Sequence, residues 1–257
     1  MTACPDLPAL TFPDEVVTFL RKEYEKADVI LEFGSGGSTF LAAGQPGKTI
    51  VSVESDPAWA QRMRDIAAAH PLPSPPRVIH ADIGPVLPWA RALDSRELDR
   101  FRDYWHSVWD DWTDAPPELV LVDGRFRAAC YMATWICTPR AVRVLFDDYG
   151  KRAQYHVIER LGRPVKMVGR MAVFDIDPAR REDIAPWLLL STYLDAVTSF
   201  KVGPEREKIK PRDYPRVLRA AIDRVVNPPR PAPRIETRYP LRRLIGAGPR
   251  WAEAASQ

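Results

Sequence analysis

A short stretch near the N-terminus combines the residue types from which nucleotide sites are built. An apolar run meets an acid at Glu32, and Gly34, Gly36 and Gly37 follow before small residues open a helix. Glycines let the backbone turn tightly and approach a ligand closely. A pyrophosphate would need helix-end N–H groups and no negative charge nearby. The carboxylate of Glu32 therefore indicates a ligand that carries positive charge.

Further acids stand where other apolar runs end. Glu54 lies eighteen residues after Gly36, a spacing at which a carboxylate can accept both hydroxyls of a ribose. Asp82 and Asp123 each follow a further apolar run. Asp147 follows a third such run and begins a pair of adjacent acids. Parallel α/β sheets bind ligands beyond the carboxyl ends of their strands, so we expect these acids to share one edge of a sheet.

Alternating strand and helix patterns must position these acids. We expect strands over residues 28–33, 49–54, 77–80, 119–123 and 142–147, then a hairpin of 165–168 and 172–176 that turns at 169–170. We expect helices over residues 13–24, 56–70, 127–137, 153–161 and 184–200. The alternation predicts an α/β fold, with a Rossmann-like, doubly wound, mostly parallel seven-stranded sheet and an antiparallel edge hairpin.

The stretch Glu32-Phe-Gly-Ser-Gly-Gly-Ser-Thr39, with Glu54 and Asp82 after the next two strands, resembles the motifs of class I S-adenosylmethionine-dependent methyltransferases. The resemblance covers about residues 28–177 and extends to a bacterial branch whose acceptor it does not name. It implies S-adenosylmethionine as cofactor and methyl transfer to an oxygen or nitrogen of a small acceptor. The implied cofactor contacts are Glu32, Gly34, Ser35, Gly36, Gly37, Ser38, Thr39, Glu54, Ser55, Asp82 and Ile83.

The same resemblance implies that Asp123 and Asp148 carry out the chemistry. Asp123 stands where the family places a residue beside the transferred methyl group, and either carboxylate could take a proton from the acceptor. Arg125 and Arg127 follow directly. They could bind an anionic substrate or pair with nearby acids, and the sequence leaves both readings open.

A divalent metal is a less favoured alternative. Asp147 and Asp148, facing Asp123, resemble in placement the metal ligands of catechol-type O-methyltransferases, which form a hard-cation site. The usual motif there reads acid, small residue, acid, lysine, whereas this chain has Asp-Gly-Arg-Phe from Asp123. We therefore assign no metal ligands.

Two other functions remain as alternatives on the same fold. One is a nicotinamide-dependent oxidoreductase, although Thr39 occupies the place of the third glycine in the dinucleotide pattern. The other is a cofactor-binding protein without turnover, which would act through its tail or its insertion. The fold alone does not decide between these functions.

The distribution of charge divides the chain. Its net charge is +3, yet residues 201–257 hold 14 Lys and Arg against six Asp and Glu, and they are rich in proline. We expect a methyltransferase-like cofactor-binding domain over 1–200 and a basic, proline-rich, partly helical extension over 201–257. The extension could meet an anionic surface. Nucleic acid is less favoured because aromatic residues for base stacking are few.

An aromatic insertion over residues 88–117 precedes the fourth strand. Trp105, Trp109 and Trp112 recur at helical spacing, so they could pack in the core, form a dimer seam or make a lid over the acceptor. The three cysteines form no CxxC pair, which argues against a disulfide scaffold or a zinc site. We expect no secretory leader and no membrane span, and therefore a cytoplasmic protein.

Overall fold

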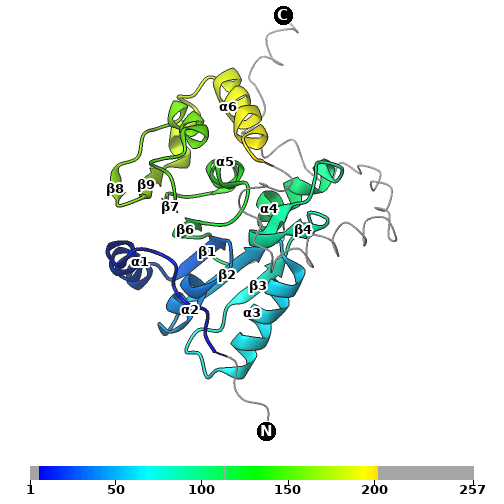
Figure 1. Cartoon of the computed structure of the whole chain (residues 1–257). Coiled ribbons are helices and arrows are strands. Elements are labelled where there is room, and N and C mark those ends of the chain that lie inside the picture. The colour runs from blue at the N-terminus through cyan, green and yellow to red at the C-terminus, as the bar shows by residue number, and fades with distance from the viewer. Residues whose placement is uncertain (1–5, 111, 113, 202–257) are drawn as a thin grey trace, which may run out of the picture.

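The computed structural model describes residues 6–110, 112 and 114–201 of the 257-residue chain (Figure 1). The predicted extension lies outside the described residues beyond Lys201, and so does Cys4. None of the described helices has both the length and the apolar run that a bilayer span requires.

A seven-stranded sheet forms the centre of the fold. Its strands, in spatial order, are β3 (Arg77–His80), β2 (Thr49–Glu54), β1 (Val29–Phe33), β6 (Leu119–Val122), β7 (Val142–Phe146), β9 (Met171–Ile176) and β8 (Lys166–Val168). The first five run parallel, and β9 is antiparallel to both of its neighbours. The mostly parallel sheet with its hairpin is thus confirmed; β8 is the edge strand and β9 lies one place inside it.

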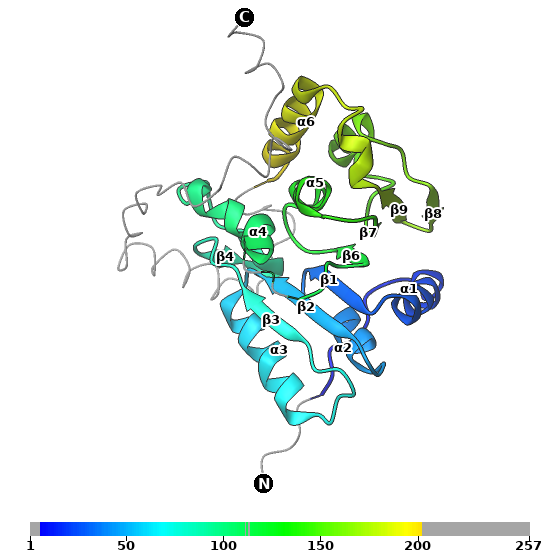
Figure 2. The ribbon, with the colours of Figure 1, turned by 180° about the vertical axis from the view of Figure 1, so that it is seen from behind.

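Helices cover both faces of this sheet (Figure 2). One face carries α1 (Asp14–Lys26), α2 (Gly37–Ala43) and α3 (Pro57–Ala69). The other face carries α4 (Leu98–Asp110) and α5 (Arg127–Cys137). The last described helix, α6 (Pro186–Thr198), packs on α5. The described residues also contain short 3-10 helices, which are η1 (Pro88–Ala90), η2 (Ala153–Arg160) and η3 (Pro178–Arg181).

Burial on both faces explains the unbroken aliphatic runs of the central strands. Ile30 and Leu121 pack with α1, while Leu31 and Val120 point the other way and pack with α4 and α5. Each of these side chains is fully buried. Parallel strands covered on two faces need apolar residues at every position, which is why the sequence showed runs rather than alternation.

The aromatic insertion contributes to the core. It begins with a small hairpin of β4 (Val86–Leu87) and β5 (Arg91–Ala92), and α4 follows. Trp105 and Trp109 on α4 are almost completely buried in the main core. Trp112 lies beyond the end of α4 and stacks on Trp109, with ring centroids 6.0 Å apart. Core packing therefore accounts for this aromatic face.

The turns after β1 and β6 touch through their backbones. Gly34 has φ of +109°, and a Cβ atom there would lie 2.7 Å from the backbone of Gly124. The N–H of Gly124 donates to the carbonyl of Phe33 at 2.6 Å. Side chains at either glycine would push the two turns apart. Gly36, by contrast, has open space around the position of a Cβ atom.

This contact predicts different outcomes for two glycine substitutions. Gly34→Ala should lower the free energy of unfolding by about 2–4 kcal/mol, because it combines left-handed strain with a backbone clash. Gly36→Ala should change it by less than about 1 kcal/mol. Urea unfolding of the two variants measures the difference. Equal losses would show that the fold does not depend on the contact between the turns.

Candidate active site

The end of β2 presents Glu54 to the glycine turn. Its Oε1 accepts hydrogen bonds from the backbone N–H groups of Ser55 and Asp56, at 2.7 and 2.9 Å. Its Oε2 faces the N–H of Ser35 at 3.4 Å. The carboxylate is therefore held in one orientation between β2 and the turn. The open space at Gly36 leaves the backbone accessible beside it.

Glu32 supports the glycine turn from the protein interior. It is fully buried, and its two carboxylate oxygens accept from the hydroxyls of Tyr24 and Thr39. The Thr39 hydroxyl in turn accepts from the N–H of Gly36 at 3.1 Å. Glu32 thus acts on the turn through Thr39, and its predicted direct contact with a cofactor stays a prediction. Burial raises the pKa of Glu32 to about 7 against these hydrogen bonds.

The serines of the predicted cofactor site lie at the same edge of the sheet, beyond β1 and β2. The Ser35 hydroxyl lies 2.6 Å from that of Ser52, and the Ser35 carbonyl accepts from the indole of Trp59. Ser38 and Ser55 are buried. The sequence-predicted residues at the ends of β1 and β2 therefore do lie together.

Asp82 and Ile83 occupy different surroundings. The Asp82 carboxylate accepts from the N–H of Gly84 at 2.9 Å, closing a local turn, and pairs with Arg100 of α4. Asp82 is exposed, whereas Ile83 is buried in the main core. Their predicted place beside a nucleobase stays a prediction.

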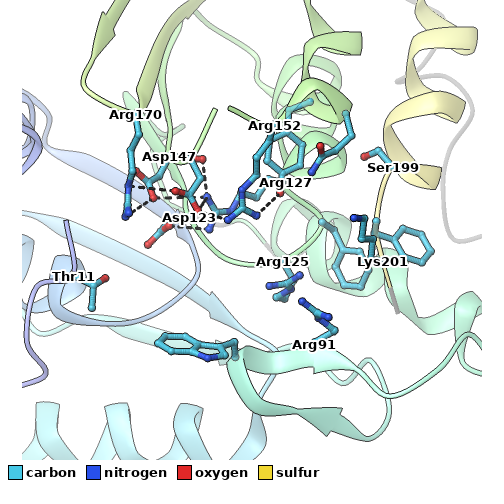
Figure 3. Close-up of a pocket in the computed structure, with 16 residues that line it drawn as sticks. Thr11, Arg91, Asp123, Arg125, Arg127, Asp147, Arg152, Arg170, Ser199 and Lys201 are labelled. Atoms are coloured by element: carbon cyan, nitrogen blue, oxygen red, sulfur yellow. Dashed lines mark hydrogen bonds and ion pairs between the residues drawn. The ribbon is translucent and has the colours of Figure 1, made fainter. Parts of the chain in front are cut away.

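A cavity of about 590 Å³ opens beyond the ends of β6 and β7 (Figure 3). Three carboxylates and six cationic side chains line it. The charged lining residues are Asp123, Asp147, Asp148, Arg91, Arg125, Arg127, Arg152, Arg170 and Lys201. The predicted catalytic residues Asp123 and Asp148 are therefore brought to one cavity.

Arg127 ties the ends of β6 and β7 together. Its Nη2 lies 3.1 Å from Oδ1 of Asp123, and its Nη1 lies 3.5 Å from Oδ2 of Asp148. The same Nη1 donates to the carbonyl of Asp147 at 2.6 Å, and Nε donates to the carbonyl of Gly124 at 3.0 Å. Of the two readings left open for this arginine, the structure supports pairing with acids.

Asp148 meets three guanidinium groups. Arg152 lies 2.5 Å from Oδ2, Arg170 lies 3.4 Å from Oδ1, and Arg127 completes the set. Arg170 also donates to the buried carboxylate of Asp147 at 2.9 Å. Within the described residues, no group of three or more His, Cys, Asp and Glu side chains is placed to hold a metal ion. These aspartates face arginines instead.

Asp123 differs from its neighbours in exposure and in the number of its partners. Its side chain is 27% exposed to the cavity, and Arg127 is the ion-pair partner described for it. Burial raises the pKa of the Asp123 carboxyl well above its usual range, and the charge of Asp147 adds to this, while Arg127 opposes it. Asp123 is therefore a stronger base than an ordinary aspartate.

Comparison with known proteins identifies the family. No protein-family profile matches the chain, and no curated protein matches it either. Among solved structures, the chain is 40% identical to a methyltransferase-like protein from Silicibacter pomeroyi DSS-3; the match covers 75% of this chain and 98% of that one, with a TM-score of 0.68. The chain belongs to the class I S-adenosylmethionine-dependent methyltransferase superfamily.

A more distant match is an O-methyltransferase from Bacillus cereus in complex with SAH. The identity is 18%, the match covers 60% of this chain and 64% of that one, and the TM-score is 0.41. That likeness carries no weight in the assignment of this methyltransferase.

Three arginines of the methyltransferase site were not found from the sequence, namely Arg91, Arg152 and Arg170. Arg152 lies four residues after Asp148, and that spacing was an available signal. Arg170 sits in the turn between β8 and β9, and only the pairing of β9 with β7 brings it to the aspartates.

The pKa of Glu32 predicts how the stability of this methyltransferase depends on pH. Because the folded-state pKa of about 7 exceeds the ordinary 4.5, protonated Glu32 adds stability below pH 4.5, and this is lost as pH rises through 7. Relative to Glu32→Gln, the wild-type free energy of unfolding should therefore fall by up to about 3 kcal/mol across that range. Urea unfolding of both proteins at a series of pH values measures it, and parallel curves would contradict the prediction.

Proposed function

We propose that this protein transfers a methyl group from S-adenosylmethionine to an oxygen or nitrogen nucleophile of a small acceptor. The contact between Gly34 and Gly124 carries the proposal. Gly34 belongs to the turn that resembles the cofactor motif, and Gly124 directly follows Asp123 at the cavity. A cofactor on that turn and an acceptor in the cavity would lie next to each other where the two glycines touch. Direct transfer of a methyl group requires such proximity.

The residues at the ends of β1 and β2 fit the cofactor. Glu54, oriented by two backbone N–H groups, would accept the two ribose hydroxyls. The open backbone at Gly36 would allow close approach of the amino acid portion. When bound, the cofactor supplies an electrophilic methyl group on a sulfonium. The chain then has to align the acceptor and manage its proton.

Asp123 is the residue proposed to take that proton. A raised pKa brings a carboxylate closer to the operating pH, where general-base catalysis is most effective. The ion pair with Arg127 fixes the direction of the carboxylate. Asp148 already faces Arg127, Arg152 and Arg170, so its proposed part is to anchor that cluster beside the acceptor.

Titration calorimetry tests the cofactor. S-Adenosylmethionine should bind in the micromolar range, and Glu54→Ala should weaken binding by about 1–3 kcal/mol, the value of hydrogen bonds to a charged group. Glu25→Ala, which removes an exposed acid on α1, is the matched control and should leave affinity unchanged. Tight binding of NADH in place of S-adenosylmethionine would point to the oxidoreductase alternative.

Methyl transfer from labelled S-adenosylmethionine to a panel of small hydroxy and amino acceptors tests Asp123. Asp123→Asn should keep cofactor affinity and lower turnover by about 10²–10⁴-fold, the usual contribution of a general base. The wild-type rate should rise with pH as Asp123 loses its proton, and the variant should lack this rise.

Asp65→Asn, at an exposed position on α3, controls for the change of charge. Undiminished turnover in Asp123→Asn would leave Asp148 as the first candidate for the base.

A further inference from the structure

Arg125 and Arg127 stand two residues apart at the same cavity but differ in what they contact. Arg127 pairs with aspartates, as described above. The structure gives the Arg125 guanidinium no hydrogen bond and no ion pair with any described residue. Its side chain is partly buried and lines the cavity. A partly buried cation without an anionic partner among the described residues loses hydration that no ion pair replaces, and an anionic ligand in the cavity would supply that partner.

The backbone of Arg125 is held firmly, which directs its side chain. Its N–H donates to the Tyr104 hydroxyl at 3.2 Å, and its carbonyl accepts from the Cys130 thiol at 3.3 Å. Gly124 leaves the room that the Tyr104 hydroxyl occupies. The next residue, Phe126, has φ of +49° and is kept in this left-handed conformation by packing among aromatic rings. The turn therefore presents Arg125 to the cavity in a preorganised way.

Positive charge accumulates around Arg125. Figure 3 shows its guanidinium beside that of Arg91, away from the aspartate cluster. Burial lowers the pKa of Arg125, and the charges of Arg127 and Arg91 lower it further. The three carboxylates of the cavity already face Arg127, Arg152 and Arg170. Six cationic side chains and three carboxylates thus line the cavity.

We propose that Arg125 binds an oxyanion of the acceptor, so that the methyl-accepting substrate is a small molecule carrying a carboxylate or phosphate as well as its nucleophile. The planar guanidinium fork matches either group with two parallel hydrogen bonds. Asp123 and Arg125 come from one turn, which sets the nucleophile and the oxyanion at neighbouring places. That the bound molecule is the methyl acceptor rests on the proposed methyl transfer. The oxyanion site itself does not depend on turnover.

Titration calorimetry with two matched probes tests the site. 4-Hydroxybenzoate and 4-hydroxybenzamide have the same ring and hydroxyl and differ in charge. Wild-type protein should bind the carboxylate at least tenfold more tightly than the amide. Arg125→Gln should remove that preference, and Arg125→Lys should retain part of it because the charge stays while the fork is lost. Arg163→Gln, at an exposed position that does not line the cavity, should behave as wild type.

Thermal unfolding gives a second test, in which Arg125→Gln should be more stable than the wild type although it binds the carboxylate less tightly. Without added anion, Arg125→Gln should raise the melting temperature, because it removes a cation held among other cations. Inorganic phosphate should then raise the melting temperature of the wild type more than that of Arg125→Gln. If phosphate competes with 4-hydroxybenzoate, the site accepts both kinds of oxyanion; if only the benzoate binds, the site is selective for carboxylates.

The decisive contrast is with the cofactor, whose own amino acid portion carries a carboxylate. S-Adenosylmethionine affinity should be the same in wild type and Arg125→Gln. A loss of cofactor affinity with an unchanged benzoate preference would overturn the inference, and so would equal binding of the two probes by the wild type. If the benzoate preference stands while S-adenosylmethionine fails to bind, the oxyanion site survives and the proposed methyl transfer fails.

Discussion

The close approach of two backbone turns, at Gly34 and Gly124, is the constraint on which the site depends. The turns follow β1 and β6, which are neighbours in the sheet, and the absence of side chains lets the chain segments touch. The first turn carries the glycine-rich stretch that resembles the cofactor motif, and the second carries Asp123 and Arg125. Direct group transfer tolerates little error in position, and a contact between main chains is among the stiffest ways to set it.

Charge neutralisation is the second organising element. Aspartates at the ends of β6 and β7 would repel one another if left alone. Arg127 pairs with aspartates at both ends, and Arg170 pairs with the two that follow β7. Removing one partner of such a set leaves an uncompensated charge and destabilises the fold. These arginines are therefore needed for stability as well as for the position of the aspartates. This separates the cations that maintain the cavity from Arg125, which pairs with no acid in the described part of the chain.

Much of the fold could be predicted because its signals are local. The aliphatic runs of β2 and β3 and the span of α5 agree with the predicted bounds, since glycine, proline and polar residues interrupt the chain close to the ends of these elements. The meeting of Asp123 with Asp148 also followed from the rule that ligands bind at the carboxyl ends of parallel strands.

What could not be predicted depends on partners distant in the sequence. The sequence leaves the same two readings open for Arg125 and Arg127, and the ion pairs of Arg127 with Asp123 and Asp148 distinguish them in the structure. Nothing local in the sequence shows that the hydroxyls of Tyr24 and Thr39 donate to the two carboxylate oxygens of Glu32. Trp112 has helical spacing with Trp105 in the sequence, although α4 ends at Asp110. The spacing of aromatic residues alone does not show where a helix ends.

The aromatic packing around Phe126 has a consequence for the order in which the protein is assembled. Phe126 contacts Phe200, which follows α6 and also lines the cavity. Glu32 and Glu54, by contrast, belong to β1 and β2, which come much earlier in the chain. During N-to-C synthesis the residues of β1 and β2 therefore leave the ribosome well before Phe200, which supplies one wall of the cavity.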